Sequence, residues 1–351
     1  MKKSCLILFS FTACLLVFSF TKAFAKDISE VFPIGIYCVD DTKYIKDLKE
    51  CGFNIIQTYK KDKETVKKFA LECGNHDMFL LAYPDEIIQS DYTEEAKNRN
   101  IVWYLFDEPD IFNYPPADLK EKDKAVKAIF PNQKTAFVIS QGGTENDYYS
   151  IADILMVDWY PVPHLPLKSL GDQIYIARKE LDNRNLREKP LWAVIQAFDW
   201  FDFPQKREDK VGGFPSYEQI RFMTYHAVLN GAEGIFYFYF KTKDKGLLIE
   251  NKENWDRLAK VVKEISALSD IFIKGKIIDN PVIIDYPLIM KTWEYEGKRY
   301  SIIANINIEE ELLPFGLLDK KYKLKFEKSA SLKTVNRGQK IKPFRVYVLE
   351  F

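Results

Sequence analysis

The sequence predicts an α/β protein in which a (β/α)8 TIM barrel is followed by a small antiparallel β-sandwich domain. The first observation is an alternation of short apolar runs with amphipathic stretches from about residue 32 to residue 268. The second is the length of this region, since a typical barrel takes about 250 residues. The third is a change of pattern after about Lys274, where short strand-like segments replace the helical ones. No G-x-G-x-x-G or Walker sequence occurs, which argues against a doubly wound nucleotide-binding sheet.

The first 25 residues have the features of a secretory signal peptide. Lys2 and Lys3 form a positive n-region, residues 6–20 are apolar, and Ala23-Phe24-Ala25 provides small residues before a cleavage site. We therefore expect export and cleavage after Ala25, to a secreted, periplasmic or cell-envelope location. Two alternatives stay open. One is an uncleaved anchor, although the apolar stretch is shorter than the roughly 20 residues of a membrane span. The other is lipidation at Cys14, although the apolar run continues past it. We expect no membrane span in the mature chain.

Eight apolar runs predict the eight barrel strands, because strands buried on both faces of a parallel sheet read as continuous apolar segments. The runs are residues 33–38, 53–59, 78–83, 101–106, 134–140, 153–159, 190–196 and 234–240. Helical patterns separate most of them, at residues 42–50, 63–72, 117–129, 167–181 and 217–229, and residues 251–268 follow the last run. Ser216 and Gln219 predict a capping box at the start of the 217–229 helix.

The organisation expected for the chain is a signal peptide at 1–25, a barrel at 26–273 and a β domain at 274–351. Strand-like segments in the last part are residues 282–289, 291–295, 299–306, 322–327 and 344–351. Turn residues such as Glu296-Gly297 separate them, as expected for antiparallel strands. This domain carries no charged cluster that suggests catalysis.

Composition narrows the classes of partner. Acidic and basic residues balance at 51 each, so we expect no nucleic-acid partner. After signal cleavage Cys38, Cys51 and Cys73 remain, which permits at most one disulfide, and they are not spaced like metal ligands. With only three histidines, we expect neither a metal nor another cofactor. Aromatic residues make up 15%, which fits a large core and also a cleft that stacks on sugar rings.

The densest chemical signal is the segment WYLFDEPD, from Trp103 to Asp110. Reactive residues of barrel enzymes lie at the carboxyl ends of the strands, and this segment places Asp107 and Glu108 directly after the fourth run. Burial and a neighbouring like charge raise a carboxyl pKa there, which is what the general acid of glycosidic bond cleavage needs. We therefore predict Glu108 as a general acid. The competing explanation is that the two acids only cap a loop or pair with a lysine.

The chain resembles the large clan of barrel glycoside hydrolases whose catalytic carboxylates end strands four and seven. The resemblance covers the order of the barrel elements, the appended β domain and two short motifs. Asp107-Glu108-Pro109 is similar to the Asn-Glu-Pro of that clan, and Asp158-x-Tyr160-Pro161 is common among barrel glycosidases. By this resemblance Glu108 is the acid/base and an oligo- or polysaccharide is the substrate.

One departure concerns the nucleophile, which the clan takes from a Glu that ends strand seven. This chain has Gln196 at that place, and an amide cannot be a carboxylate nucleophile. Asp158 on strand six is the favoured second carboxylate, and Asp199 beyond strand seven is another candidate. A separation of about 5–5.5 Å between the two carboxyls would predict retention, and about 6.5–9.5 Å inversion. Alternatively, an N-acetyl group of the substrate assists while Gln196 orients it, or the site binds sugar without cutting it.

Aromatic residues near the strand ends are candidate platforms for pyranose rings. Together with Asp107 and Gln196, the substrate-binding candidates are Tyr37, Tyr59, Tyr83, Tyr160, Phe198, Trp200 and Tyr239. Any one of these aromatics can equally be a core residue. The leading hypothesis is an exported glycoside hydrolase. The alternatives are a non-catalytic carbohydrate-binding barrel of the cell envelope and an envelope protein that binds its partner through the β domain.

Overall fold

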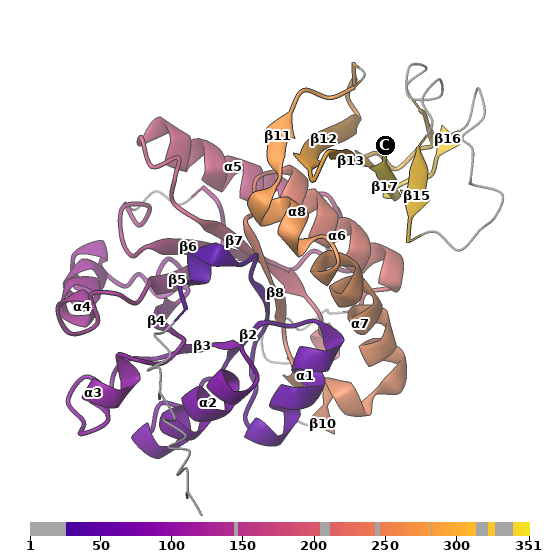
Figure 1. The fold of residues 1–351 in the computed structure, drawn as a ribbon. Helices are drawn as coiled ribbons and strands as arrows, with labels where there is room; N and C mark the ends of the chain where they lie inside the picture. Colours follow the sequence, from indigo (N-terminus) through magenta and orange to yellow (C-terminus); the bar gives the residue numbers. More distant parts are fainter. Residues whose placement is uncertain are drawn as a thin grey trace, which may run out of the picture.

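A computed structural model describes residues 26–143, 147–203, 211–242, 246–281, 283–313, 322–326 and 340–351. Eight parallel strands follow one another around a closed barrel, and the last strand pairs with the first (Figure 1). The strands are β1 (Ile34–Ile36), β2 (Ile55–Gln57), β3 (Phe79–Ala82), β4 (Ile101–Asp107), β5 (Thr135–Ile139), β6 (Ile154–Trp159), β7 (Leu191–Gln196) and β8 (Gly234–Phe238). Each lies within a predicted apolar run or extends it by one residue, so the barrel prediction is confirmed.

Helices surround the strands as predicted for most connections. They are η1 (Ile28–Glu30), η2 (Thr42–Tyr44), α1 (Ile45–Cys51), α2 (Lys63–Asn75), α3 (Thr93–Ala96), α4 (Pro116–Ile129), α5 (Ser169–Asn183), η3 (Trp200–Asp202), α6 (Tyr217–Leu229), η5 (Leu248–Glu250), α7 (Lys252–Ser266) and α8 (Ser269–Lys274). The capping box at Ser216 and Gln219 is present and starts α6. Over the described ranges of the chain, none of these helices has the length and apolar character of a membrane span.

The strands separate two apolar cores, and side chains alternate between them. Trp103 and Leu105 of β4 pack outward against the helices, whereas Val102 and Tyr104 point into the barrel. Gly35 of β1 leaves room inside the barrel, because a Cβ at this position would lie 2.3 Å from the ring of Phe236. The barrel interior is therefore filled by large side chains, and a ligand can approach only from its ends.

The C-terminal region forms an antiparallel sheet in the order β11-β12-β13-β17-β15, with a separate β14-β16 pair. The strands are β11 (Lys276–Ile278), β12 (Leu288–Tyr295), β13 (Lys298–Asn305), β14 (Glu311–Leu312), β15 (Lys323–Lys325), β16 (Lys340–Ile341) and β17 (Val346–Glu350). A further pair, β9 (Lys241–Thr242) and β10 (Gly246–Leu247), follows β8. The predicted antiparallel domain is confirmed, but two boundaries are wrong. Residues 288–295 are one strand rather than parts of two, and β11 was missed because its exposed side chains give no apolar run.

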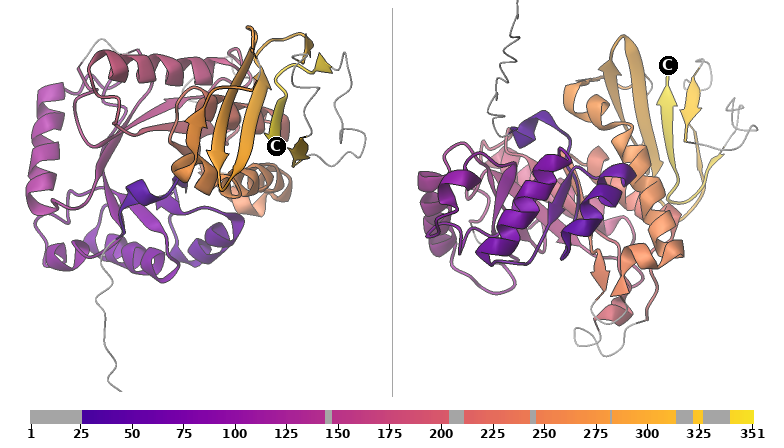
Figure 2. Two further views of the ribbon diagram at one scale, coloured as in Figure 1. Left: turned by 45° about the horizontal axis from the view of Figure 1, so that its top comes forward. Right: turned by 60° about the horizontal axis from the view of Figure 1, so that its bottom comes forward.

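The sheet lies against the flank of the barrel, beside α6 and α8 (Figures 1 and 2). One face of the sheet continues the outer core of the barrel through Trp293, Ile302 and Val348. A buried ion pair stands at this junction: Arg221 Nε of α6 donates to Glu264 Oε2 of α7 at 2.7 Å, and Arg221 Nη1 donates to the carbonyl of Val346 in β17 at 2.7 Å. The junction is therefore held by both apolar packing and a charged link.

Candidate active site

Two backbone irregularities at the end of β4 aim Glu108 toward the mouth of the barrel. The pairing of β4 with β5 shifts register between Tyr104 and Asp107. Glu108 then adopts φ 55°, in the left-handed region that non-glycine residues seldom occupy. Such bulges and positive φ values occur next to functional sites because they redirect a side chain away from the regular strand direction.

Neighbouring contacts hold this irregular backbone in place. The Glu108 amide donates to the carbonyl of Val138 at 3.1 Å. The backbone amide of Ser140 donates to the Asp110 carboxylate, at 3.0 Å to Oδ2, and the hydroxyl of Ser140 donates to the same oxygen at 2.7 Å. The hydroxyl of Tyr148 donates to the carbonyl of Pro109 at 3.2 Å. The loop after β4 is thus fixed against β5, and the acid predicted at 108 stands on a rigid support.

Asp107 is engaged by two tyrosine hydroxyls. Tyr104 donates to Asp107 Oδ1 at 2.6 Å, and Tyr59 donates to Asp107 Oδ2 at 3.2 Å. Hydrogen bonds from neutral donors favour the ionised form of a carboxyl group. Both carboxylate oxygens of Asp107 therefore accept hydrogen bonds from tyrosines at the mouth of the barrel.

Asp158, at the end of β6, is 7% exposed. It lies close enough to Glu108 and Asp107 for the charges of both to act on its carboxyl group. Burial, the charge of Glu108 and the charge of Asp107 together hold the pKa of Asp158 well above its ordinary value, while the hydrogen bond from Tyr160 opposes them. Two neighbouring carboxyl groups, one of them buried, resist being ionised together, so the pair retains one proton between them. The structure thus brings together two of the three predicted catalytic acids.

Asp199 lies on the loop after β7 and begins η3. Its Oδ1 accepts the backbone amides of Phe201 and Gly213, each at 2.9 Å. Asp199 is therefore a capping residue, whose carboxylate accepts backbone N–H groups that have no acceptor within the turn. No described contact places Asp199 beside Glu108.

Gln196 ends β7 and is fully buried. Its amide nitrogen donates to the carbonyls of Val162 at 2.8 Å and Phe198 at 3.3 Å, and its amide oxygen accepts the Val162 amide at 2.9 Å. The amide thus ties the end of β7 to the loop after β6. All of these contacts are with backbone atoms, so the side chain is committed to holding the loops rather than to the open mouth.

The predicted aromatic residues form two walls at the mouth. A tyrosine wall, Tyr37, Tyr59, Tyr83 and Tyr104, stands over β1 to β4, with ring centroids of neighbours 5.2–6.3 Å apart. An apolar wall over β6 to β8 consists of Tyr160, Phe198, Trp200, Phe203, Phe238 and Tyr239, with neighbouring centroids 4.7–6.4 Å apart. The two walls meet where Tyr37 and Phe238 approach at 5.9 Å.

Exposure sorts these residues into floor and rim. Tyr37, Tyr83, Phe198 and Tyr239 are buried, so they support the walls from below. Tyr59 is 36% exposed, and Tyr160 and Trp200 are partly exposed, so these three present ring faces at the rim. Sequence reasoning missed Tyr104, Phe203 and Phe238. For Tyr104 a signal existed, because the period of two along β4 places it on the same face as Val102, inside the barrel.

Two other features were checked as possible sites. In the portion of the chain that the structure describes, no group of three or more His, Cys, Asp or Glu could hold a metal ion. A crevice of about 980 Å³ lies at the opposite, amino-terminal end of the strands, between η1, the ends of α5 and α6, and the C-terminal sheet. Phe32 and Trp192 in its lining are buried, whereas Tyr175 and Ile277 in the same lining are exposed.

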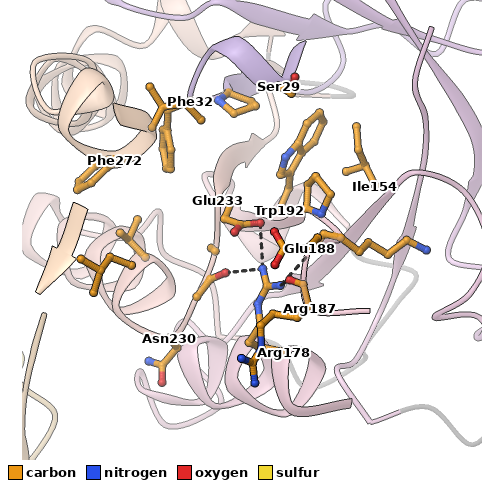
Figure 3. A pocket seen from close by; sticks show the side chains of 18 of the residues that line it. Ser29, Phe32, Ile154, Arg178, Arg187, Glu188, Trp192, Asn230, Glu233 and Phe272 are labelled. Atoms are coloured by element: carbon orange, nitrogen blue, oxygen red, sulfur yellow. Dashed lines mark hydrogen bonds and ion pairs between the residues drawn. The ribbon is translucent and has the colours of Figure 1, made fainter. Parts of the chain in front are cut away.

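Arg178 occupies the centre of this crevice (Figure 3). It donates to the carbonyls of Arg187, Lys189 and Gly231 at 2.9–3.1 Å, and Nη2 also reaches Glu233 at 3.1 Å. These contacts tie α5 to the starts of β7 and β8. The crevice is therefore a polar joint of the scaffold, and the carboxyl pair lies at the other end of the barrel.

Comparison with known proteins places the fold among carbohydrate-active barrels. No family model and no curated protein sequence matches the chain. Solved structures similar to it include an alpha-amylase from Geobacillus thermoleovorans, at TM-score 0.54 and 12% identity, covering 92% of this chain and 98% of that one. A GH30 endoxylanase from Clostridium papyrosolvens has TM-score 0.53 and 10% identity, with coverages of 92% and 96%. Eubacterium rectale Amy13B has TM-score 0.58 and 10% identity, with coverages of 94% and 97%. At such identities the comparison shows a shared barrel fold.

Proposed function

We propose that the protein is an exported glycoside hydrolase in which Glu108 delivers a proton to the glycosidic oxygen and Asp158 is its partner carboxyl. The observation that carries this proposal is the nearness of two acids at the carboxyl ends of β4 and β6, where the buried Asp158 has its pKa raised by burial and by the charge of Glu108. Glycoside hydrolysis needs a carboxylic acid that is still protonated near neutral pH. A buried pair that shares one proton satisfies that requirement.

The assignment of roles within the pair follows from burial. Asp158 is 7% exposed, whereas Glu108 is only partly buried and stands on the loop that turns toward the mouth. The more accessible group is the one that can reach a bound glycan, so Glu108 delivers the proton.

The two aromatic walls support a carbohydrate as the substrate. Rim rings such as Tyr59, Tyr160 and Trp200 suit the C–H faces of pyranose rings. Two of the solved structures that share this fold are an alpha-amylase and an endoxylanase. Export follows from the signal-peptide pattern of residues 1–25, which lie outside the described part of the chain.

The proposal is tested by incubating the protein with a panel of oligo- and polysaccharides and measuring released reducing ends. We expect Glu108→Gln and Asp158→Asn each to lower turnover about 10²- to 10⁴-fold, the usual contribution of a general acid. Glu188→Gln, at an exposed acid on the opposite end of the barrel, is the matched control and should leave turnover unchanged.

Three outcomes would contradict the assignment. Unchanged turnover in Glu108→Gln would show that another group is the acid. Glycan binding without turnover in the unmodified protein, with affinity kept in Glu108→Gln, would instead favour the non-catalytic carbohydrate-binding barrel. Absence of glycan affinity in the barrel would favour an envelope protein that acts through its β domain.

A further inference from the structure

The turn that follows Glu108 presents two large apolar side chains to water. Ile111 is 53% exposed and Phe112 is 66% exposed. The backbone amides of both residues donate to the carbonyl of Glu108, at 3.1 and 3.3 Å. Glu108 and Phe112 are therefore the two ends of a single α-turn, with five residues from one end to the other.

The residue types at the tip of this turn are unusual. Short turns are made mainly of Gly, Pro, Asn, Asp and Ser, whose conformations or side chains suit a tight reversal of the backbone. A single exposed apolar side chain on a surface is ordinary. Here two of them, Ile111 and Phe112, are consecutive at the tip, directly after the proposed acid. Departures from local preference of this kind are expected at functional positions.

The underside of the turn is held rigidly. The Asp110 carboxylate accepts the backbone amide and the hydroxyl of Ser140, at 3.0 and 2.7 Å. The hydroxyl of Tyr148 lies between the carbonyls of Pro109 and Tyr114, at 3.2 and 2.6 Å. The polar contacts are thus made on the side that faces the barrel, and the apolar tip stands on a fixed base. A side chain presented in this way loses little conformational freedom when a ligand binds to it.

The two aromatic walls leave the mouth open beside this turn. The tyrosine wall stands over β1 to β4 and the apolar wall over β6 to β8, and they meet where Tyr37 approaches Phe238 at 5.9 Å. Among the residues that the structure describes, neither wall contains a ring from β5, and the polar Ser140 and Gln141 follow that strand. Because β5 pairs with β4, the opening lies next to Glu108. A glycan held between the walls therefore has its open side toward the turn.

The position of the acid decides which part of a glycan reaches the turn. A general acid protonates the oxygen of the leaving group, so the departing part of the substrate lies next to Glu108. The chain between β4 and Pro116 runs from the inner ring of strands to α4 in the outer ring (Figure 1). Phe112 thus lies farther along this outward path than Glu108. A leaving sugar that extends outward past the acid runs over the tip of the turn.

We infer that Ile111 and Phe112 form a binding subsite for the sugar on the leaving side of the scissile bond, with the ring of Phe112 as its platform. This inference rests on the proposed function and narrows its substrate class. The substrate is an oligo- or polysaccharide with at least one sugar unit on the leaving side, rather than a glycoside of a small non-sugar group. The face of Phe112 suits the C–H face of a pyranose ring, and Ile111 extends the apolar surface beside it.

The test measures kcat/KM for matched pairs of substrates. Each pair consists of an oligosaccharide from the glycan panel and the glycosyl fluoride of the part that it donates, so only the oligosaccharide has a sugar on the leaving side. We expect Phe112→Ala to lower the ratio of kcat/KM for the oligosaccharide to kcat/KM for the fluoride by about tenfold, the loss of one aromatic platform. Phe112→Trp keeps an aromatic face and should hold this ratio within about twofold of its original value.

A second exposed aromatic residue provides the control. Tyr175 is 47% exposed and lines the crevice at the opposite end of the barrel. Tyr175→Ala should leave the ratio unchanged. Both aromatic residues lie at the surface, where substitutions usually change stability little, so urea denaturation should show that the variants are folded.

The outcomes separate this inference from the proposed function. An unchanged ratio in Phe112→Ala would overturn the inference while the glycoside hydrolase stands. Equal losses for the oligosaccharide and the fluoride would overturn it as well, because the ring would then act on the acid rather than on a leaving sugar. If the unmodified protein cleaves neither the oligosaccharides nor the fluorides, the proposed function itself fails.

Discussion

Gln196→Glu introduces a carboxyl at the place where the similar clan of barrel hydrolases has its nucleophile. If the barrel were a degenerate member that lost this group, the substitution would create glycan turnover or raise it. The structure predicts the opposite result. The amide nitrogen of Gln196 faces two carbonyl oxygens, those of Val162 and Phe198, and a carboxylate would place a third oxygen against them.

The magnitude follows from burial and hydrogen bonding. The side chain is fully buried, so the new acid will stay protonated in the folded protein, with one O–H donor where the amide had two. Losing one buried bond costs about 1–3 kcal/mol at any pH. Because the folded pKa is raised above the unfolded value of about 4.3, a further loss of about 1.4 kcal/mol accrues for each pH unit above 4.3 until the folded pKa is reached.

Urea denaturation at pH 4.5 and pH 7 measures this difference. We expect the deficit of Gln196→Glu against the unmodified protein to be larger at pH 7 by about 2–4 kcal/mol, with no gain in glycan turnover. Gln89→Glu, at an exposed position, is the control and should show no such difference between the two pH values. A variant equally stable at both pH values, or one with increased turnover, would refute the structural role of the amide.

Two further predictions concern the scaffold. Glu264→Gln removes the charge that faces Arg221, whose side chain is 4% exposed, and should lower the unfolding free energy measured in urea by about 3–5 kcal/mol. Glu253→Gln, at an exposed ion pair on the same helix, is the control and should lower it little. Equal losses in the two variants would contradict the prediction. Burial lowers the pKa of His226 to about 4. Because the unfolded chain takes up this proton first, about 3 kcal/mol of stability should be lost as the pH falls from 6.5 to 4, and His226→Leu should remove this loss. An identical pH slope in the variant would show that other groups cause it.

The barrel was predictable because a strand buried on both faces is apolar at consecutive positions, which can be seen in the sequence. Each strand between two apolar cores must be apolar at consecutive positions, so β4 and β7 stand out as runs in the sequence. β11 left no such trace, since Lys276 and Ile277 are exposed at the edge of the sheet. Residues 282–289 show the opposite error. Val282 lies outside the described residues and Ile283 is 87% exposed, so the apolar character of this run does not report burial.

The candidate site was only partly predictable, because the motifs give position along a strand but not contact across the barrel. Glu108 and Asp158 could be assigned to strand ends from sequence. Their nearness depends on the bulge in β4 and the left-handed turn at Glu108, which no residue preference announces, since neither residue is a glycine. Tyr104 is different, because the period of two along β4 places it on the same inward face as Val102 and so could have identified it.

The amide of Gln196 and the position of Asp158 are linked through the loop after β6. A nucleophile at the end of β7 requires that the loop after β6 leave its oxygens accessible, but here the backbone of Val162 closes over the side chain at 2.8–2.9 Å. The same loop begins at Tyr160, two residues after Asp158. Holding this loop against β7 therefore fixes the carboxyl end of β6, where Asp158 stands, and releasing it to admit a carboxylate at 196 would disturb that end. Restoring the two-carboxylate arrangement thus needs a change in the β6 loop as well, which is why the single substitution should cost stability without creating activity.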